Sequence, residues 1–308
     1  MRLALSLLLA LSLYAEESRS GTPKTLRTQV RVTTLDQDPT LDRAAFSARL
    51  DGNPAKVLRV LGPTDDLVLL LVLDLSGEPT LIDAAREALT EQLNKLPNNQ
   101  WVGVMKAQDN LTALADPTPD RDKITTVIQD YAATGKAGLL TTAESMASLG
   151  HQLLDRSGIR VAVVYITDSN IYNYREDYTN PVINATDSRD LSRRFPDQLV
   201  KEKMQKISDQ LARYETPFFI VHLNTITDPI NEAYRRGLLQ LTEESGGLSA
   251  FCRSRGEIST AIEKVIAAAA NHWSVAVELT RTKLRAVNVT LTNADRPLPN
   301  RTRFALGK

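Results

Sequence analysis

Two aspartates follow the two most apolar stretches of the chain. The run LVLLLVLD ends in Asp74, and the run IRVAVVYITD ends in Asp168. Continuous aliphatic runs of this length predict strands buried on both faces of a parallel sheet. Ligands bind such sheets outside the carboxyl ends of the strands. Two carboxylates there, with the hydroxyl of Ser76 close by, are oxygen ligands of the kind that a hard divalent cation such as Mg²⁺ prefers.

The elements that must position these residues alternate along the chain from residue 66 to residue 271. Apolar runs predict strands at 67–74, 101–107, 111–115, 159–168, 216–223 and 248–253. Helical spacing of apolar residues predicts helices at 79–96, 119–133, 141–156, 197–214, 229–244 and 256–271. This alternation predicts a doubly wound, mostly parallel α/β sheet, with 111–115 as an antiparallel edge strand.

Both ends of the chain have a different pattern. Apolar and polar residues alternate in TQVRVTTL near the start, and Asp51-Gly52 is a tight-turn signal in the segment that follows. Alternation returns at 273–279, 285–292 and 302–306. We expect these segments to pair into a small β module. The predicted division is a signal peptide at 1–15, an N-terminal β segment at 16–62, an α/β domain at 63–272 and a C-terminal β segment at 273–308.

The first 15 residues have the pattern of a secretory signal. Met1-Arg2 is a short basic start, LALSLLLALSLY is apolar, and Ala15 precedes a polar stretch. The apolar run is shorter than the roughly 20 residues that span a bilayer. We therefore expect a protein that is secreted or lies in the periplasm or cell envelope, with no membrane span after cleavage. An uncleaved anchor is the alternative.

Composition excludes several function classes. Lys+Arg and Asp+Glu both number 37, so no overall charge recruits nucleic acid or an anionic membrane. The lone Cys252 cannot form an internal disulfide. His151, His222 and His272 have no metal-ligand spacing, and no sequence motif pairs a nucleophile with a base. An enzyme is therefore not expected.

The residues after the first buried strand resemble a known metal site. Asp74-Leu75-Ser76-Gly77-Glu78 is similar to the D-x-S-x-S motif of the metal-ion-dependent adhesion site in von Willebrand factor A (vWA) domains. The helix LIDAAREAL resembles the first vWA helix, and ITDS at 166–169 resembles the strand that ends in the second aspartate. Residues 42–60 and 238–251 resemble segments of the vWFA-related family described from acidobacteria, so the resemblance covers nearly all of the mature chain.

The resemblance implies a cation site and a non-enzymatic binding role. Asp74, Ser76 and Asp168 match the pattern, but Glu78 stands where a second serine is expected. The usual threonine position falls on Leu140, with a threonine one residue later. The candidate ligands for Mg²⁺ or another divalent cation are Asp74, Ser76, Glu78, Thr141 and Asp168. The alternative is a vestigial site that holds no metal.

A long polar segment at 169–196 follows the second aspartate. Loops of this length without secondary structure are functional or disordered. Residues of the types favoured at interfaces lie in it: Tyr172, Tyr174, Arg175 and Tyr178. We interpret them as a partner-binding surface beside the metal site. The alternative is that the tyrosines pack locally under a solvated flap.

Two functions therefore remain open at the level of sequence. The first is a secreted vWA-type module that binds a protein or another extracellular ligand through a degenerate cation site. The second is a structural or scaffold protein of the envelope whose site is metal-free.

Overall fold

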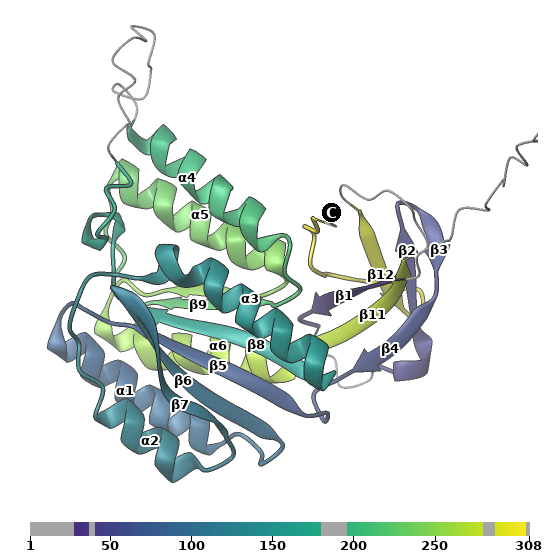
Figure 1. The fold of residues 1–308 in the computed structure, drawn as a ribbon, viewed down its shortest axis with the longest axis horizontal. Coiled ribbons are helices and arrows are strands. Elements are labelled where there is room, and N and C mark those ends of the chain that lie inside the picture. Colours follow the sequence, from purple (N-terminus) through teal and green to yellow (C-terminus); the bar gives the residue numbers. More distant parts are fainter. Residues whose placement is uncertain (1–27, 37–40, 180–195, 280–286, 306–308) are drawn as a thin grey trace, which may run out of the picture.

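The computed structural model describes residues 28–36, 41–179, 196–279 and 287–305, which form an α/β domain and an adjoining β module (Figure 1). The domain is built on one six-stranded sheet in the order β10-β9-β8-β5-β6-β7. Its strands are β5 (Leu67–Asp74), β6 (Gln100–Gln108), β7 (Asn110–Thr118), β8 (Arg160–Thr167), β9 (Phe218–His222) and β10 (Ser249–Phe251). All neighbours are parallel except β7, which pairs antiparallel with β6.

This order is that of a doubly wound sheet. The first strand, β5, lies between β6 and β8, so the chain builds outward first in one direction and then in the other. Helices cover both faces (Figure 1). One face carries α1 (Pro79–Asn94), α2 (Arg121–Gln129) and α6 (Ile258–Asn271); the other carries α3 (Leu139–Ser157), α4 (Pro196–Leu211) and α5 (Pro229–Ser245). The predicted fold class and the antiparallel edge strand are confirmed.

Strand β5 contributes side chains to the hydrophobic cores on both faces of the sheet. All eight of its residues are buried. Because successive side chains of a strand point to opposite faces, Leu69 and Leu71 join the core under α1 and α6, whereas Leu70 and Val72 join the core under α3 and α5. The run of seven apolar residues before Asp74 is therefore a direct requirement of the two-sided cover.

The terminal segments form the β module. Its strands are β1 (Thr28–Thr34), β2 (Phe46–Leu50), β3 (Asn53–Ala55), β4 (Val57–Leu61), β11 (Trp273–Leu279), β12 (Val289–Asn293) and β13 (Arg296–Leu298). They pair as two antiparallel sheets, β1-β11-β4 and β13-β12-β2-β3, so each sheet combines strands from both ends of the chain. The predicted turn at Asp51-Gly52 has positive φ at both residues (47° and 81°) and joins β2 to β3.

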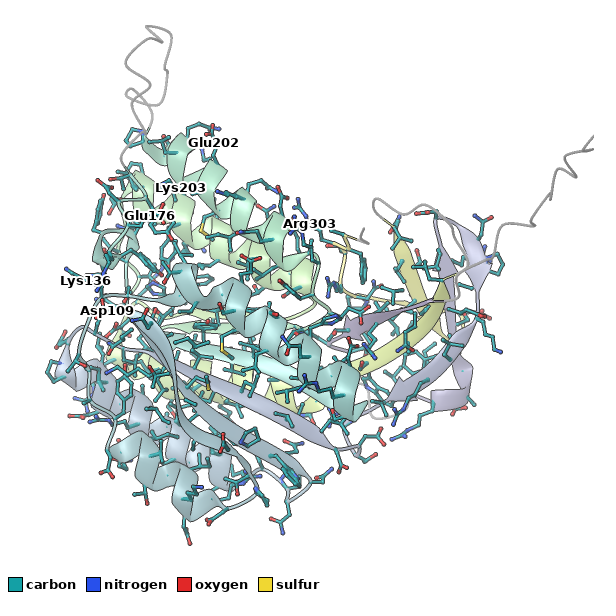
Figure 2. All side chains as sticks on the ribbon, in the orientation of Figure 1. Asp109, Lys136, Glu176, Glu202, Lys203 and Arg303 are labelled. Carbon is teal, nitrogen blue, oxygen red and sulfur yellow. The ribbon has the colours of Figure 1, made fainter. Side chains whose placement is uncertain are left out.

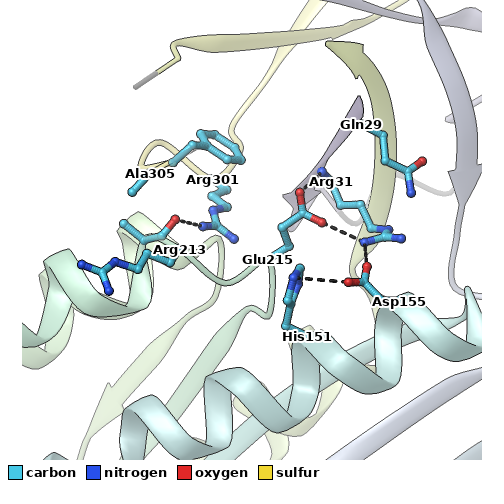
Figure 3. A pocket seen from close by; sticks show the side chains of 10 residues that line it. Gln29, Arg31, His151, Asp155, Arg213, Glu215, Arg301 and Ala305 are labelled. Carbon is cyan, nitrogen blue, oxygen red and sulfur yellow. Dashed lines mark hydrogen bonds and ion pairs between the residues drawn. The ribbon is translucent and has the colours of Figure 1, made fainter. Parts of the chain in front are cut away.

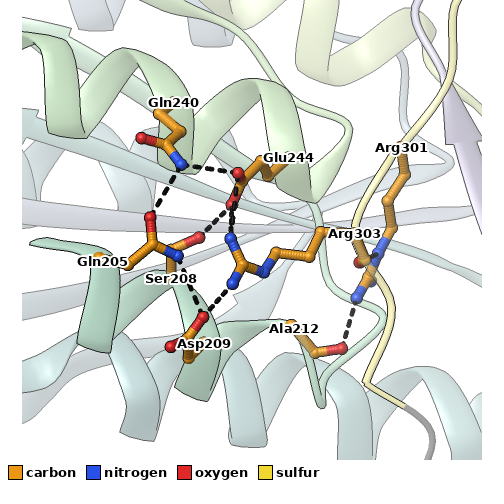
Figure 4. A network of polar contacts seen from close by, with 8 residues as sticks. All are labelled: Gln205, Ser208, Asp209, Ala212, Gln240, Glu244, Arg301 and Arg303. Atoms are coloured by element: carbon orange, nitrogen blue, oxygen red, sulfur yellow. Dashed lines mark hydrogen bonds and ion pairs between the residues drawn. The ribbon is translucent and has the colours of Figure 1, made fainter. Parts of the chain in front are cut away.

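One terminal prediction is wrong. Residues 302–305, expected to be part of a strand, form no strand in the structure and instead run along α4 and α5. The backbone N–H of Ala305 donates to Ala212 (2.8 Å), and the Arg303 guanidinium donates to both carboxylate oxygens of Glu244 (3.1 and 3.0 Å) and pairs with Asp209 (Figure 4). The alternating pattern thus reflects a segment with one face on the domain rather than strand pairing.

A buried arginine helps to join the two parts. Arg160, at the start of β8, has no exposed surface. Its Nη1 donates to the carbonyls of Ala270 (2.8 Å) and His272 (2.9 Å), and its Nη2 donates to those of Pro63 (3.0 Å) and Asp65 (2.7 Å). These carbonyls lie at the two points where the chain crosses between module and domain. Burial lowers the Arg160 pKa to about 10, so the guanidinium stays charged at neutral pH.

None of the helices in the described part of the chain combines the length and the apolarity that crossing a bilayer requires. The predicted signal peptide at 1–15 lies outside the described residues.

We predict that Arg160→Met lowers the free energy of unfolding by about 3 kcal/mol, because several buried carbonyls lose a charged donor together. Urea unfolding followed by circular dichroism measures this. Arg156→Met is the matched control: Arg156 is exposed on α3, and its loss should change stability by no more than about 0.5 kcal/mol. Equal effects of the two substitutions would show that the hydrogen bonds of Arg160 to these carbonyls do not stabilise the fold.

Candidate functional site

The two strand-end aspartates lie at the point where the strand order reverses. Asp74 ends β5, and Asp168 directly follows β8, the strand paired with β5 on the side away from β6. In the pairing register Asp74 is opposite Thr167, and the backbone N–H of Asp168 donates to the carbonyl of Asp74 (3.4 Å). The carboxyl end of the sheet at this reversal is where doubly wound folds bind ligands.

Asp74 is fully buried and its carboxylate is held by three donors. The backbone N–H of Gly138 donates to Oδ1 (2.8 Å), while Leu139 N–H (3.2 Å) and the Thr167 hydroxyl (2.9 Å) donate to Oδ2. Two of these donors are backbone groups at the start of α3, where a helix favours negative charge. Burial nevertheless raises the pKa of Asp74 to about 7, since desolvation exceeds the effect of these bonds.

Asp168 is wrapped by the loop that follows β5. The backbone N–H of Ser76 donates to both carboxylate oxygens (2.9 and 3.2 Å), and that of Gly77 donates to Oδ2 (2.7 Å). A Cβ atom on Gly77 would lie only 2.9 Å from that oxygen, so the glycine permits the close approach. Burial raises the pKa of Asp168, and these hydrogen bonds oppose the rise.

Two hydroxyl residues of the site were not singled out in the sequence. The Ser169 hydroxyl lies 3.4 Å from Oδ1 of Asp168 and 3.3 Å from the Ser76 hydroxyl, and Thr167 supports Asp74. The available signal was the I-T-D-S order, which places a hydroxyl on each side of Asp168. Ser76, Asp168 and Ser169 therefore form one group of oxygen donors.

The candidate ligand Glu78 faces another way. It is exposed at the start of α1, and its Oε1 accepts a hydrogen bond from the Thr80 hydroxyl (2.5 Å). Within the described ranges, Glu78 does not form a three-residue ligand group with Asp74 and Asp168. The structure thus brings the two aspartates together and leaves Glu78 aside.

The threonine position is apolar, as the sequence indicated. Leu140 is buried in the core under α3, and Thr141 is exposed with its hydroxyl donating to the carbonyl of Gly138 (3.0 Å). The next residue, Thr142, is buried and bonds the Tyr165 hydroxyl (2.9 Å). The start of α3 therefore offers Asp74 backbone N–H groups, where the adhesion-site pattern offers a threonine hydroxyl.

The donor set suits a hard cation in type. Ser76, Asp168 and Ser169 supply only oxygen atoms, as Mg²⁺ prefers, and such ions retain several waters. Asp74 already accepts three hydrogen bonds, so it would support these three residues from behind rather than offer both of its carboxylate oxygens to a cation.

A buried histidine supports the site from behind. His222, at the end of β9, donates from Nε2 to the carbonyl of Ser169 (2.9 Å), and its ring packs edge-on against Tyr234. Burial lowers the His222 pKa to about 4, so the ring is neutral at physiological pH. Among the described residues Nε2 has this partner, whereas the buried Nδ1 has none.

The expected partner surface is corrected by the structure. Tyr172 is 55% exposed, but Tyr174 and Tyr178 are buried at 6% and 5%. The Tyr174 hydroxyl bonds that of Tyr234 (2.6 Å), and the rings of Tyr174 and Tyr178 meet edge to face at 5.4 Å. These two rings complete the core under α5, because removing their large apolar surface from water stabilises the fold.

The charged residues around these tyrosines are solvent-facing. Arg175 is exposed and pairs with Asp109 (2.7 Å). Lys203, in the middle of α4, lies over the Tyr178 ring and 3.4 Å from Glu176 (Figure 2). Of the predicted surface, Tyr172 and Arg175 remain accessible. Residues 180–195 of the loop lie outside the described residues.

The sequence matches no protein-family model, and no curated protein matches it. Similar solved structures include a von Willebrand factor type A protein from Catenulispora acidiphila (TM-score 0.44, 8% identity, 92% of this chain and 74% of that chain). Another is the conserved hypothetical protein BatB from Bacteroides thetaiotaomicron (0.41, 13%, 67% and 98%). A third is the vWF domain of the type V pili tip protein Mfa5 from Porphyromonas gingivalis (0.39, 12%, 66% and 94%). At these low values the strand order, not the likeness, carries the fold assignment.

We predict that Tyr174→Ser and Tyr178→Ser each lower the free energy of unfolding by about 3 kcal/mol, because each opens a cavity in the core. Tyr172→Ser is the matched control and should cost no more than about 0.5 kcal/mol, since its ring is exposed. Thermal and urea unfolding measure both. If all three serine variants were as stable as the unsubstituted protein, the packing of these rings would be wrong.

A second prediction concerns acid. A histidine with a lowered pKa in the folded state binds its proton first in the unfolded state, so stability falls as pH drops from 6.5 to about 4. His222→Gln keeps a donor for Ser169 and removes this titration. Between pH 7 and pH 4 we expect the free energy of unfolding of the variant to rise by roughly 3 kcal/mol relative to that of the unsubstituted protein.

Comparison of the His222→Gln variant with the unsubstituted protein isolates the contribution of His222 to the pH dependence of stability. Asp74 titrates with the opposite sign, because its raised pKa favours the folded state as pH falls through about 7, but it does so in both proteins. Urea unfolding of both proteins at pH 7 and pH 4 is the measurement. A stability difference that stays constant with pH would contradict the prediction.

Proposed function

We propose that this chain, a von Willebrand factor A (vWA)-type domain with an attached β module, is a non-enzymatic binding module. One observation carries the proposal: Asp74 and Asp168 end neighbouring strands at the reversal of the sheet order, and the loop from Ser76 to Gly77 closes around Asp168. This arrangement gathers oxygen atoms at the edge of the sheet. It supplies no nucleophile activated by a base.

The partner is a protein or another extracellular ligand that presents an acidic group. Asp168, Ser76 and Ser169 are the residues that would hold a divalent cation such as Mg²⁺. When bound, the ion supplies an open coordination position for a carboxylate of the partner. Tyr172 and Arg175, which are both exposed in the segment after β8, would then contact the partner.

A second candidate is a scaffold protein of the envelope with a metal-free site. Three features support it: the Asp74 carboxylate already has three donors, Leu140 occupies the threonine position, and Glu78 bonds Thr80. Hydrogen bonds from backbone N–H groups stabilise both carboxylates without an ion. In this role the fold would serve packing alone.

Export is part of the proposal. The apolar segment at 1–15 supports cleavage and a location in the periplasm, the envelope or the medium. Capture of partners from the envelope fraction with and without EDTA separates the two candidates, since only the first loses its partner when cations are chelated.

We predict that the protein binds Mg²⁺ or Mn²⁺ at about 1 mM or below and that Asp168→Asn weakens this binding at least about tenfold, because a neutral amide replaces a carboxylate. Calorimetric titration measures both. Glu78→Ser should strengthen cation-dependent binding of an acidic ligand such as a short glutamate peptide, because it removes a negative charge that directly follows the Ser76-Gly77 loop and repels the carboxylates of the ligand.

The matched control is Glu87→Ser, which removes the same charge from an exposed position on α1 and should change neither titration. Two results would decide for the scaffold. One is the absence of cation binding by any of these proteins at millimolar concentration; the other is partner capture that EDTA leaves unchanged.

A further inference from the structure

A second concave site lies at the junction of the two parts, away from the strand-end aspartates. It is a pocket of about 320 Å³ lined by residues of β1, of the C-terminal half of α3, of the segment from α4 to β9 and of the C-terminal segment (Figure 3). Three arginines and two carboxylates line it: Arg31, Arg213, Arg301, Asp155 and Glu215. These five side chains carry a net charge of +1 (three cations less two anions).

The acidic side of the pocket already has its cation. His151, Asp155 and Glu215 place ligand atoms within 4.8 Å of one another, a spacing that would suit a metal ion. The guanidinium of Arg31, however, lies between the carboxylates and pairs with Asp155 (2.6 Å) and Glu215 (2.8 Å). The backbone N–H of Arg31 also donates to Glu215 (2.9 Å). A metal ion would have to displace an arginine that is bonded on both sides.

The basic side lacks an anion. Arg301 is 1% exposed, and its Nε and Nη2 donate to the carbonyls of Arg303 (2.9 Å) and Ala212 (3.0 Å). Its guanidinium lies over the Phe304 ring at 4.6 Å. Among the residues that the structure describes, Nη1 of Arg301 has no hydrogen-bond partner and no carboxylate forms an ion pair with this guanidinium. A buried charge without a counter-ion is costly, and an anion in the pocket would reduce that cost.

The pocket also has an apolar wall, formed by Phe304, Ala212 and Ala305. Sites for small molecules combine such a wall with a few placed polar groups. The net charge of +1 suits a monoanion, whereas a dianionic phosphate would be repelled by Asp155 and Glu215. The volume is at the lower end of the range for small-molecule sites.

We propose that the junction pocket binds a small organic carboxylate that carries an apolar group. The carboxylate pairs with the Arg301 guanidinium on its Nη1 side, after a small shift of the residues that cover this atom. The apolar group packs on Phe304 and the neighbouring alanines. Because the pocket is formed by both parts of the protein, the ligand holds the β module against the α/β domain. This site is independent of the function proposed above for the strand-end aspartates.

The test is calorimetric titration of the full chain with 4-phenylbutyrate and with its uncharged amide, 4-phenylbutanamide. We expect the carboxylate to bind at least about tenfold more tightly than the amide, since only the former pairs with a buried guanidinium. Arg301→Gln should abolish this difference, whereas Arg156→Gln, at an exposed arginine of α3, should leave it unchanged. Equal binding of acid and amide, or no binding of either, overturns the proposal.

A second measurement keeps the test valid if Arg301→Gln does not fold. Titration of the unsubstituted protein with 4-phenylbutyrate, followed by the amide NMR signals, should shift Arg31, Arg213 and Ala305. Shifts confined to Ser76 and Asp168 overturn the proposal, because they place the ligand at the strand ends. Titration with Zn²⁺ decides the rival case: tight Zn²⁺ binding that His151→Ala removes, without carboxylate binding, makes the pocket a cation site.

Discussion

A strand with apolar residues at seven of its eight positions, buried on both faces, ends in a carboxylate, and much of the domain is arranged to accommodate that charge. Asp74 lies out of reach of water, so its oxygens must be satisfied by the protein. The start of α3 provides two backbone N–H groups, and β8 provides the Thr167 hydroxyl. Helix α3 can approach this closely because Gly138 has no Cβ, which would otherwise collide with the carbonyl of Ala107 on β6.

The same requirement explains the departure from the adhesion-site pattern. When the first residues of α3 turn their backbone toward Asp74, their side chains turn into the core, and leucines at 139 and 140 fill it. A threonine is then not needed to satisfy the carboxylate. The second aspartate is treated similarly, by the backbone of Ser76 and Gly77. Both carboxylates are thus stabilised chiefly by main-chain N–H groups.

Buried arginines have a comparable part at the junction of domain and module. Arg160 and Arg301 both donate hydrogen bonds to carbonyl oxygens of segments that cross or close the junction. A guanidinium can serve this purpose because its donors point in fixed directions in one plane. Carbonyls at chain crossings are otherwise difficult to satisfy, since they lie between regular elements or in the last turn of a helix, where they have no partner within the element. The relation of the two parts therefore depends on directional bonds as well as on apolar contact.

Sequence alone determined the order of strands and helices, the parallel sheet and the position of Asp74 and Asp168 at its carboxyl edge. Burial on both faces requires continuous apolar runs, and a charged residue directly after such a run marks the end of the buried strand. The sequence also predicted the joining of the terminal β segments. It could not decide which loop tyrosines face water: Tyr172, Tyr174 and Tyr178 have the same chemistry, and only packing against Tyr234 separates them. Nor could it place Arg31, Arg160 and Arg301. Their side-chain partners lie more than 80 residues away in the sequence, except for the Arg303 carbonyl that Arg301 also bonds. Those contacts exist only once the chain has folded and both ends have met.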